Sequence, residues 1–565
     1  MTAPSGDHDV IVIGSGAGGG MAAWRLADAG VKVLMLEAGR DYDPYTETPM
    51  FNWGREAPLL GGGTPEKNFG YYLASIGGWT LPGEPYVSAE GNEFMWWRSR
   101  MLGGRTNHWA RNSFRMGPHD FRPYSRDGLG ADWPVSYDEM APYFDRVEKL
   151  IGVYGANDGL ENHPDSGPGV LHEPPKPRIN ELAIKAAAND LGIPCVASRR
   201  AVLTKNMGDR QACFNATNCG RGCNIGAAFQ STTSLIPWAR ATGNLEILTN
   251  AMVYEVETDR SGKATGVHYI DKTSGEHKFI AARVVVLAAS ACESARILLN
   301  SKNAQHPDGV SNSSGQVGRN LMDTVGASVG AQIPALENRP RYNEDGTMGL
   351  HLYIPFWDYQ RQAAGQLDFP RGYHVEIGGT FGEPGIGMGG ASWQVDGYGP
   401  QVKEDVRRYY GSFIHFSQRG EMIPNENCYA ELDPEQVDDY GIPILRFHYR
   451  HTEHEINQTA HFQQNMLEII DRLGGTPTYG ADSAPRDMMA KGGQIIHEVG
   501  TARMGDDPAT SVLNASGQSW DVPNLWVMDG AAFASKAHKN PTLTIMALAD
   551  RSCDHLIEKM RAREI

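Results

Sequence analysis

The first forty residues alternate between apolar runs and a glycine-rich turn, in the order strand, helix, strand. Residues 10–13 are β-branched and apolar, residues 21–26 have helical character, and residues 31–36 form a mostly apolar run that ends at Glu37. Two such runs around a helix predict a parallel βαβ unit. Between them lie the glycines of a G-x-G-x-x-G turn, Gly14, Gly16 and Gly19. This pattern predicts an adenine dinucleotide, with its pyrophosphate at the helix N-terminus and its ribose hydroxyls on Glu37.

The rest of the chain mixes strands and helices. Residues 246–249, 253–256 and 264–270 predict successive strands, and residues 282–289 predict a buried strand that leads into a helix. Residues 457–473 carry apolar side chains at helical spacing, which predicts an amphipathic helix. We therefore expect an α/β fold, α+β overall, in which a Rossmann-like nucleotide domain is combined with an antiparallel-sheet substrate domain.

The pattern also predicts that both domains are discontinuous. Aromatic and alternating segments such as residues 349–355 and 373–377 predict an antiparallel sheet in the second domain. The nucleotide-binding domain is expected to comprise residues 1–120, 200–330 and 491–565, and the substrate-binding domain residues 121–199 and 331–490.

A long segment from residue 40 to residue 100 lacks helix or strand periodicity for most of its length. Irregular loops of this length are usually functional. The segment contains four tryptophans, Trp53, Trp79, Trp96 and Trp97. Their side chains suit stacking against a carbohydrate or packing in a core.

The composition excludes several classes of partner. The chain of 565 residues has a formal net charge of −16, a pI near 5.6 and no run of Lys or Arg, so no nucleic-acid partner is expected. Mean hydropathy is −0.42 and no apolar run could span a bilayer, so no direct membrane insertion is expected. The first strand begins near residue 9, which leaves no room for a signal peptide of its own. We expect a cytoplasmic protein, or a periplasmic one if it is exported folded with a partner subunit.

Several separated motifs resemble those of the glucose-methanol-choline (GMC) flavoprotein oxidoreductases. Besides the N-terminal fingerprint, they lie in the family's order at residues 102–109, 286–294, 497–505 and 525–547. The resemblance covers the FAD-binding parts at both ends and in the middle of the chain, whereas residues 331–490 carry no such motif. It implies bound FAD and transfer of a hydride from an alcohol carbon to flavin N5, coupled to removal of the hydroxyl proton by a base.

The resemblance also implies roles for residues of the C-terminal motifs. His497 matches the active-site histidine, and an imidazole suits a base because its unperturbed pKa of about 6.5 lies near working pH. Asn540 matches the second polar residue, which orients the substrate oxygen, and His538 is its rival for that place. Further contacts to FAD are expected from Val253 and, along the ribityl chain, from Asp529 and Gly530.

Two roles are open for His108. The segment around it resembles one in which pyranose oxidases and some relatives carry a histidine bonded to the flavin 8α-methyl group. Such a bond needs a neutral imidazole nitrogen as nucleophile, and it would raise the flavin potential. The alternative is a histidine that packs near the dimethylbenzene ring, with FAD bound noncovalently.

Three of the seven cysteines, Cys213, Cys219 and Cys223, fall within eleven residues. Their segment resembles one in the catalytic subunits of bacterial membrane-linked glucose, gluconate and fructose dehydrogenases, which carry a three-iron four-sulfur cluster. Thiolates are the soft ligands of such clusters, and Phe214 stands where those subunits often have another cysteine, which leaves three ligands. The alternatives are simple packing, the similar cysteine turn of plant-type alcohol oxidases, and zinc, which normally takes four ligands in structural sites.

These features favour an FAD-dependent dehydrogenase that oxidises a hydroxyl group of a sugar or glycoside, including glycoside 3-dehydrogenase chemistry. Its electrons would pass through the iron-sulfur cluster to a small subunit or a cytochrome. The alternative within the family is an oxygen-using oxidase resembling pyranose oxidase. The alternative from another class is a nonenzymatic flavin electron carrier, which His497 and Asn540 disfavour. The oxidised carbon and the electron acceptor stay open.

Overall fold

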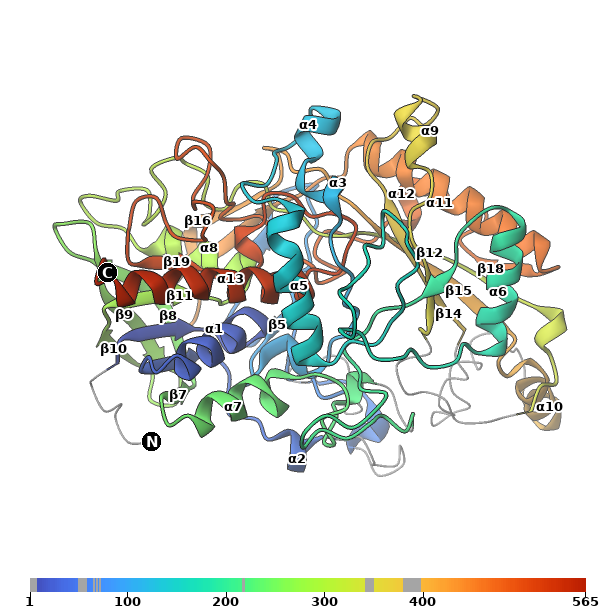
Figure 1. Ribbon diagram of the computed structural model, residues 1–565, viewed down its shortest axis with the longest axis horizontal. Helices are drawn as coiled ribbons and strands as arrows, with labels where there is room; N and C mark the ends of the chain where they lie inside the picture. Colours follow the sequence, from blue (N-terminus) through green and yellow to red (C-terminus); the bar gives the residue numbers. More distant parts are fainter. Residues whose placement is uncertain are drawn as a thin grey trace.

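A five-stranded parallel sheet organises one half of the molecule, on the left in Figure 1. The computed structural model describes residues 8–48, 58–64, 67, 70, 73–215, 219–340, 350–379 and 398–565. The strand order is β19-β11-β1-β2-β7, with bounds Leu525–Val527, Val284–Leu287, Val10–Ile13, Val33–Glu37 and Leu245–Thr249. The sheet thus combines strands from both ends and the middle of the chain. The predicted strand–helix–strand order at the N-terminus is confirmed.

Helices and a smaller sheet pack around the parallel strands. Helix α1 (Ala17–Asp28) packs against β1 and β2, and also against α7 (Leu235–Ala241) and α13 (Thr542–Arg561). Helix α5 (Tyr137–Ile151) lies next to α13. A three-stranded antiparallel sheet of β8 (Ala251–Thr258), β9 (Ala264–Asp271) and β10 (Glu276–Ala281) contacts β2 and β11. Strands covered in this way are buried along their whole length, which explains the continuous apolar runs of the sequence.

A six-stranded antiparallel sheet organises the other half of the molecule. Its order is β18-β12-β15-β14-β13-β6, with bounds Thr476–Tyr479, Val325–Gln332, Phe413–Gly420, Tyr373–Gly378, Leu352–Ile354 and Val196–Ala197. The antiparallel sheet expected here is confirmed, although β6 comes from a much earlier part of the chain. Helix α11 (Glu453–Arg472) packs on β12 and β15. It begins four residues before the predicted start because the Thr452 side chain caps it.

Further helices and strands complete the described fold. The helices are α2 (Pro44–Glu47), α3 (Pro118–Phe121), α4 (Pro123–Asp127), α6 (Ile179–Asp190), α8 (Ala291–Asn300), α9 (Tyr359–Ala363), α10 (Pro400–Tyr409) and α12 (Pro485–Met488). The strands are β3 (Gly77–Gly78), β4 (Val87–Ser88), β5 (Arg98–Ser99), β16 (Tyr429–Val437) and β17 (Pro443–His448).

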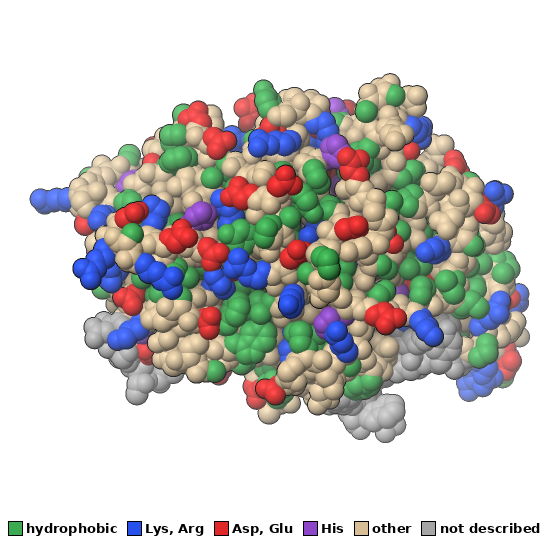
Figure 2. All heavy atoms as spheres, in the orientation of Figure 1, with side chains coloured by type: hydrophobic (Ala, Val, Ile, Leu, Met, Phe, Trp, Pro, Cys, Tyr) green, Lys and Arg blue, Asp and Glu red, His purple; other side chains and the backbone are tan. Residues whose placement is uncertain are grey.

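Each large sheet has its own apolar core. One core surrounds the parallel sheet and includes Trp96, and the other lies between the six-stranded sheet and α11. Trp53 lies outside the described residues. On the face shown in Figure 2, basic and acidic side chains are interspersed rather than gathered by sign. Among the described helices, none has the length and apolar character needed to cross a membrane.

Candidate active site

A cavity of about 560 Å³ opens where the parallel strands end. Gly14 directly follows β1, Glu37 is the last residue of β2, and Asp529 follows β19, and all three line the cavity. Ligands of open parallel sheets bind outside the carboxyl ends of the strands, as this cavity would require. Its wall continues to His497 and Asn540. The N-terminal fingerprint and the C-terminal motifs therefore face one common space.

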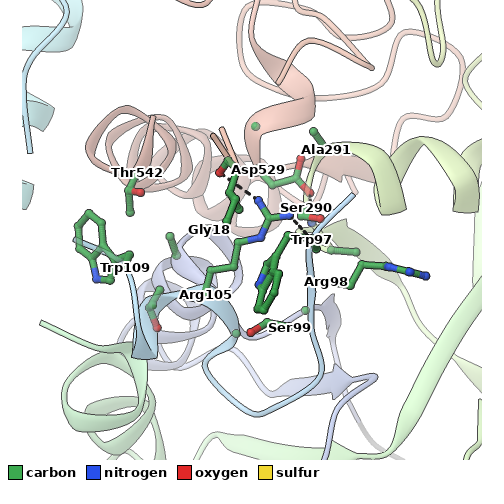
Figure 3. A pocket seen from close by; sticks show the side chains of 18 of the residues that line it. Gly18, Trp97, Arg98, Ser99, Arg105, Trp109, Ser290, Ala291, Asp529 and Thr542 are labelled. Atoms are coloured by element: carbon green, nitrogen blue, oxygen red, sulfur yellow. Dashed lines mark hydrogen bonds between the residues drawn. The ribbon is translucent and has the colours of Figure 1, made fainter. Parts of the chain in front are cut away.

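Figure 3 shows the middle of this cavity. Trp97 and Arg105 lie beside each other in this view, and Gly18 of α1 and Asp529 lie next to each other close by. The Arg105 guanidinium is fixed by an ion pair with the buried carboxylate of Glu498, 2.5 Å away. These side chains line the part of the cavity between the glycine turn and the residues of the C-terminal motifs.

The glycine turn has the shape that a pyrophosphate requires. A Cβ atom at Gly14 would lie 2.3 Å from the carbonyl oxygen of Ala288, and one at Gly19 would lie 1.9 Å from that of Gly14. A Cβ atom at Gly16, in contrast, would meet nothing within 4 Å. Gly16 is the N-cap of α1, where unpaired backbone N–H groups favour an anion. The turn is thus closed by backbone on two sides and open toward the cavity, which fits the pyrophosphate of FAD.

Glu37 is held at the nucleotide end of the cavity. Its Oε2 accepts hydrogen bonds from the backbone nitrogen of Ser15 at 3.2 Å and from the Ser15 hydroxyl, and its Oε1 accepts one from Gly39 N at 2.7 Å. Burial raises the pKa of Glu37, and these hydrogen bonds oppose the rise. The carboxylate has a fixed orientation on the cavity wall, and its contact with the ribose stays a prediction.

The other predicted FAD contacts also line the cavity. Val253 does so from β8. Asp529 is buried, and its Oδ2 accepts hydrogen bonds from Ser290 N at 3.0 Å and from the Ser294 hydroxyl at 2.6 Å. Burial raises the pKa of Asp529 to about 6. Gly530 follows, and its carbonyl oxygen accepts a hydrogen bond from Gly500 N at 2.9 Å.

His108 lies on the cavity wall beside Trp97. The two ring centroids are 5.9 Å apart in an edge arrangement, and His108 Nε2 lies 3.2 Å from Ser99 Oγ. Burial, reinforced by Arg111 and Arg105, lowers the pKa of His108 to about 3. The imidazole is therefore neutral at physiological pH, as a nucleophile toward the flavin would have to be.

His497 lines the same cavity as the fingerprint. Its Nδ1 is 2.9 Å from the Thr324 hydroxyl, and its backbone N–H donates to Asp323 at 2.9 Å. Burial, with Lys536 and Arg419 nearby, holds the pKa of His497 well below its usual value. The neutral ring is in the protonation state that a general base requires.

Asn540 is anchored by Glu376, which belongs to none of the sequence motifs. Oε1 of Glu376 accepts hydrogen bonds from Nδ2 of Asn540 at 3.2 Å and from Nδ2 of Asn112, and Oε2 pairs with Arg419 at 2.9 Å. All four residues line the cavity. Burial favours the neutral carboxyl, but Arg419 and His374 outweigh it and hold the pKa of Glu376 below its usual range. The only sequence signal was a pair of charged residues on strands β14 and β15 of a largely buried sheet.

His538, the rival of Asn540, is not among the residues that line the cavity. Its side chain is completely buried, and neither ring nitrogen has a hydrogen-bond partner within the described residues. The ring lies instead beside the carboxylates of Asp120 and Glu421. The chain therefore presents Asn540 to the cavity in place of His538.

The three cysteines lie together in a small apolar cluster. Cys219 and Cys223 are buried and Cys213 is half-buried. Burial, with the neighbouring thiol of Cys219, raises the pKa of Cys213 to about 12. Gly220, next to Cys219, lines the large cavity, so the cluster adjoins the candidate FAD site. Residues 216–218 of this segment lie outside the described residues.

Comparison with known proteins decides the family. Residues 9–325 and 424–549 match the N- and C-terminal parts described as GMC oxidoreductase. The chain belongs to the GMC oxidoreductase family. It is accordingly an FAD-dependent enzyme that acts on CH–OH donors, as the sequence motifs predicted.

Relatives of this GMC oxidoreductase include both dehydrogenases and oxidases. It is 33% identical to 2-methyl-1,2-propanediol dehydrogenase of Mycolicibacterium austroafricanum, over 98% of this chain and 96% of the relative. It is 28% identical to the fructose dehydrogenase large subunit of Gluconobacter japonicus, over 98% of each chain. It is 29% identical to paromamine 6′-oxidase of Streptomyces fradiae, over 96% of this chain and 90% of the relative. Alcohol- and sugar-type substrates are thus common to the group.

We predict that Gly16→Val folds without FAD, because the valine side chain would occupy the space of the pyrophosphate. Gly18→Ala is the contrasting variant, since its Cβ would lie 1.9 Å from the carbonyl oxygen of Met528 and should destabilise the fold itself. The ratio of flavin to protein absorbance and the thermal unfolding midpoint separate the two effects. A Gly16→Val protein that purifies with a full complement of FAD would refute the assignment.

Proposed function

We propose that this GMC oxidoreductase is a dehydrogenase that oxidises a hydroxyl group of a sugar or glycoside to the carbonyl. The observation that supports this most is the neutral His497 on the wall of the cavity that begins at the dinucleotide fingerprint. When bound, FAD supplies a hydride acceptor for the alcohol carbon. Similarity to dehydrogenases of a 1,2-diol and of fructose supports a polyhydroxylated substrate.

His497 removes the hydroxyl proton in this mechanism. When its Nδ1–H donates to the Thr324 hydroxyl at 2.9 Å, the lone pair is on Nε2, the nitrogen that accepts the proton. The hydrogen bond from the backbone N–H of His497 to Asp323 fixes the position of the residue that carries the ring. Asn540 orients the substrate: one N–H of its amide is held by Glu376, and the second N–H is available to donate to the substrate oxygen whose proton His497 removes.

The proposal includes a three-iron four-sulfur cluster held by Cys213, Cys219 and Cys223. Burial, with the neighbouring thiol of Cys219, raises the pKa values of Cys213 and Cys223, whereas coordination to iron would ionise all three thiols. The surrounding charge fits an anionic cluster. Three buried arginines interact electrostatically with the thiols. They form no ion pair within the described residues, and they are Arg111, Arg200 and Arg210.

Two of these arginines carry a buried nitrogen without a hydrogen-bond partner in the described part of the chain, Nη1 of Arg200 and Nη1 of Arg210. Cluster sulfides would accept such donors. The cluster would receive electrons from FAD and pass them to a small subunit or a cytochrome, and the similarity to a fructose dehydrogenase large subunit supports a partner of this kind. We expect the enzyme in the cytoplasm, or in the periplasm if it is exported together with its partner subunit.

Oxygen is the rival acceptor, because the similarity to paromamine 6′-oxidase is comparable. An oxidase would not need the cysteine cluster, and it would form peroxide from substrate and oxygen. The iron content of the protein therefore distinguishes the two readings.

We predict that His497→Ala slows reduction of bound FAD by about 10²-fold or more, the usual scale for losing a positioned base. Because the pKa of His497 is lowered, the base form persists in mild acid, so kcat/KM of the wild type should fall only below about pH 6.5. Anaerobic stopped-flow reduction measures the first effect and steady-state pH profiles the second. His448→Ala on β17 is the control, and an unchanged rate in His497→Ala would require another base.

We predict that FAD stays with the polypeptide after acid precipitation, because the neutral His108 on the cavity wall would be able to bond to the flavin 8α carbon, which would lose a proton and leave two electrons on the flavin until it is reoxidised. His108→Ala should release it. Mass spectrometry of tryptic peptides locates the bond. Complete release of FAD from the wild type would leave His108 as a packing residue and leave the proposed oxidation untouched.

We predict about three iron atoms per chain in aerobically purified protein, with a low-temperature paramagnetic signal from the oxidised cluster. Cys219→Ser should lose the iron and slow electron transfer to an acceptor dye, yet FAD should still be reduced by substrate. Cys195→Ser, a buried cysteine outside the cluster, should keep the iron. Iron-free wild-type protein that forms peroxide rapidly would move the enzyme to the oxidases.

A further inference from the structure

Two amide oxygens on the cavity wall have no hydrogen-bond partner in the part of the chain that the structure describes. They are Oδ1 of Asn112 and Oδ1 of Asn540, and both are buried. In both residues the amide nitrogen donates to the same atom, Oε1 of Glu376. A carboxylate can only accept, so it fixes which end of each amide faces it. Both amide oxygens therefore need a donor from outside the protein.

The ion pair beside these amides supplies the complementary groups. Arg419 Nη2 lies 2.9 Å from Glu376 Oε2, and Arg419 Nη1 donates to the backbone oxygen of Gln418 at 2.8 Å. The Arg419 side chain retains 20% exposure, and a guanidinium has five N–H donors, so donors remain for a ligand. Because Arg419 neutralises Glu376, the pair does not select a cation. It offers donors and acceptors of hydrogen bonds with no net charge.

We propose that Asn112, Glu376 and Arg419 form a subsite for a second hydroxyl group of the substrate, on the carbon next to the one oxidised. A hydroxyl group both donates and accepts, so it can satisfy an orphan amide oxygen and an Arg419 N–H together. The adjacent carbon follows from Asn540, a single amide whose nitrogen reaches Glu376 with one N–H and the reacting oxygen with the other, while its oxygen remains for the neighbouring hydroxyl group. This subsite rests on the proposed function, and it defines the substrate class as uncharged vicinal diols and polyols.

The subsite gives the enzyme a way to reject monoalcohols. A substrate without the second hydroxyl leaves the buried amide oxygens and the ion pair without a ligand partner, and sites built on hydrogen bonds discriminate strongly against such analogues. We expect trans-1,2-cyclohexanediol to exceed cyclohexanol by about 10-fold or more in the rate constant of FAD reduction divided by Kd. trans-2-Methoxycyclohexanol, which has the bulk but no second donor, should resemble cyclohexanol.

The test compares these three probes in the holoenzyme and its variants by anaerobic stopped flow. The concentration dependence gives the reduction rate, and perturbation of the flavin absorbance before reduction gives Kd. Glu376→Gln and Arg419→Met should bring the diol-to-monoalcohol ratio close to one. Glu431→Gln, an isosteric change on β16 outside the cavity, should leave the ratio as in the wild type.

The outcomes separate this proposal from the one on which it rests. A wild-type ratio near one, or a ratio unchanged in both FAD-loaded variants, overturns the subsite and leaves the oxidation intact. A uniform loss with all three probes shows a structural role and also overturns it. If neither these probes nor a panel of sugars reduces FAD, the proposed function fails, and the subsite is then judged by Kd alone: equal Kd values for diol and monoalcohol overturn it.

Discussion

The close approach of the backbone at the N-terminus of α1 determines where the rest of the site can lie. Gly18 and Gly19 leave space for no side chain, because an added Cβ would lie 1.9 Å from a carbonyl oxygen at each position. Helix α1 is thereby seated directly on the ends of β1 and β19. The space in front of Gly16 is open and belongs to the cavity.

The same turn positions the loop that carries His108. The Ser15 hydroxyl donates to Glu37 and accepts a hydrogen bond from Gly103 N at 2.8 Å, so one side chain joins the glycine turn, the end of β2 and the loop. A Cβ atom at Gly104 would lie 3.7 Å from Gly16 Cα, which shows how closely the loop covers the turn. Burial keeps the imidazole of His108 neutral, and burial likewise keeps the imidazole of His497 neutral.

Local sequence patterns predicted the strands that are buried along their whole length. Strands β1, β2 and β11 read as apolar runs because they are covered on both sides. The predicted cofactor residues other than Gly19, with His497 and Asn540, line one cavity, whereas Gly19 packs against the backbone of Gly14. Their chemical roles and the division into two domains stay predictions. Glu376 and Arg419 could not be predicted, because only the pairing of β14 with β15 brings them beside Asn540.

The most direct measurement is an anaerobic titration of the purified holoenzyme with a panel of sugars and small polyols, followed by flavin absorbance. An alcohol-oxidising enzyme with a neutral base beside its FAD site should show bleaching of the oxidised flavin by at least one uncharged polyol, in the absence of any electron acceptor. A flavin spectrum that every sugar, polyol and simple alcohol leaves unchanged, in protein fully loaded with FAD, would contradict the account.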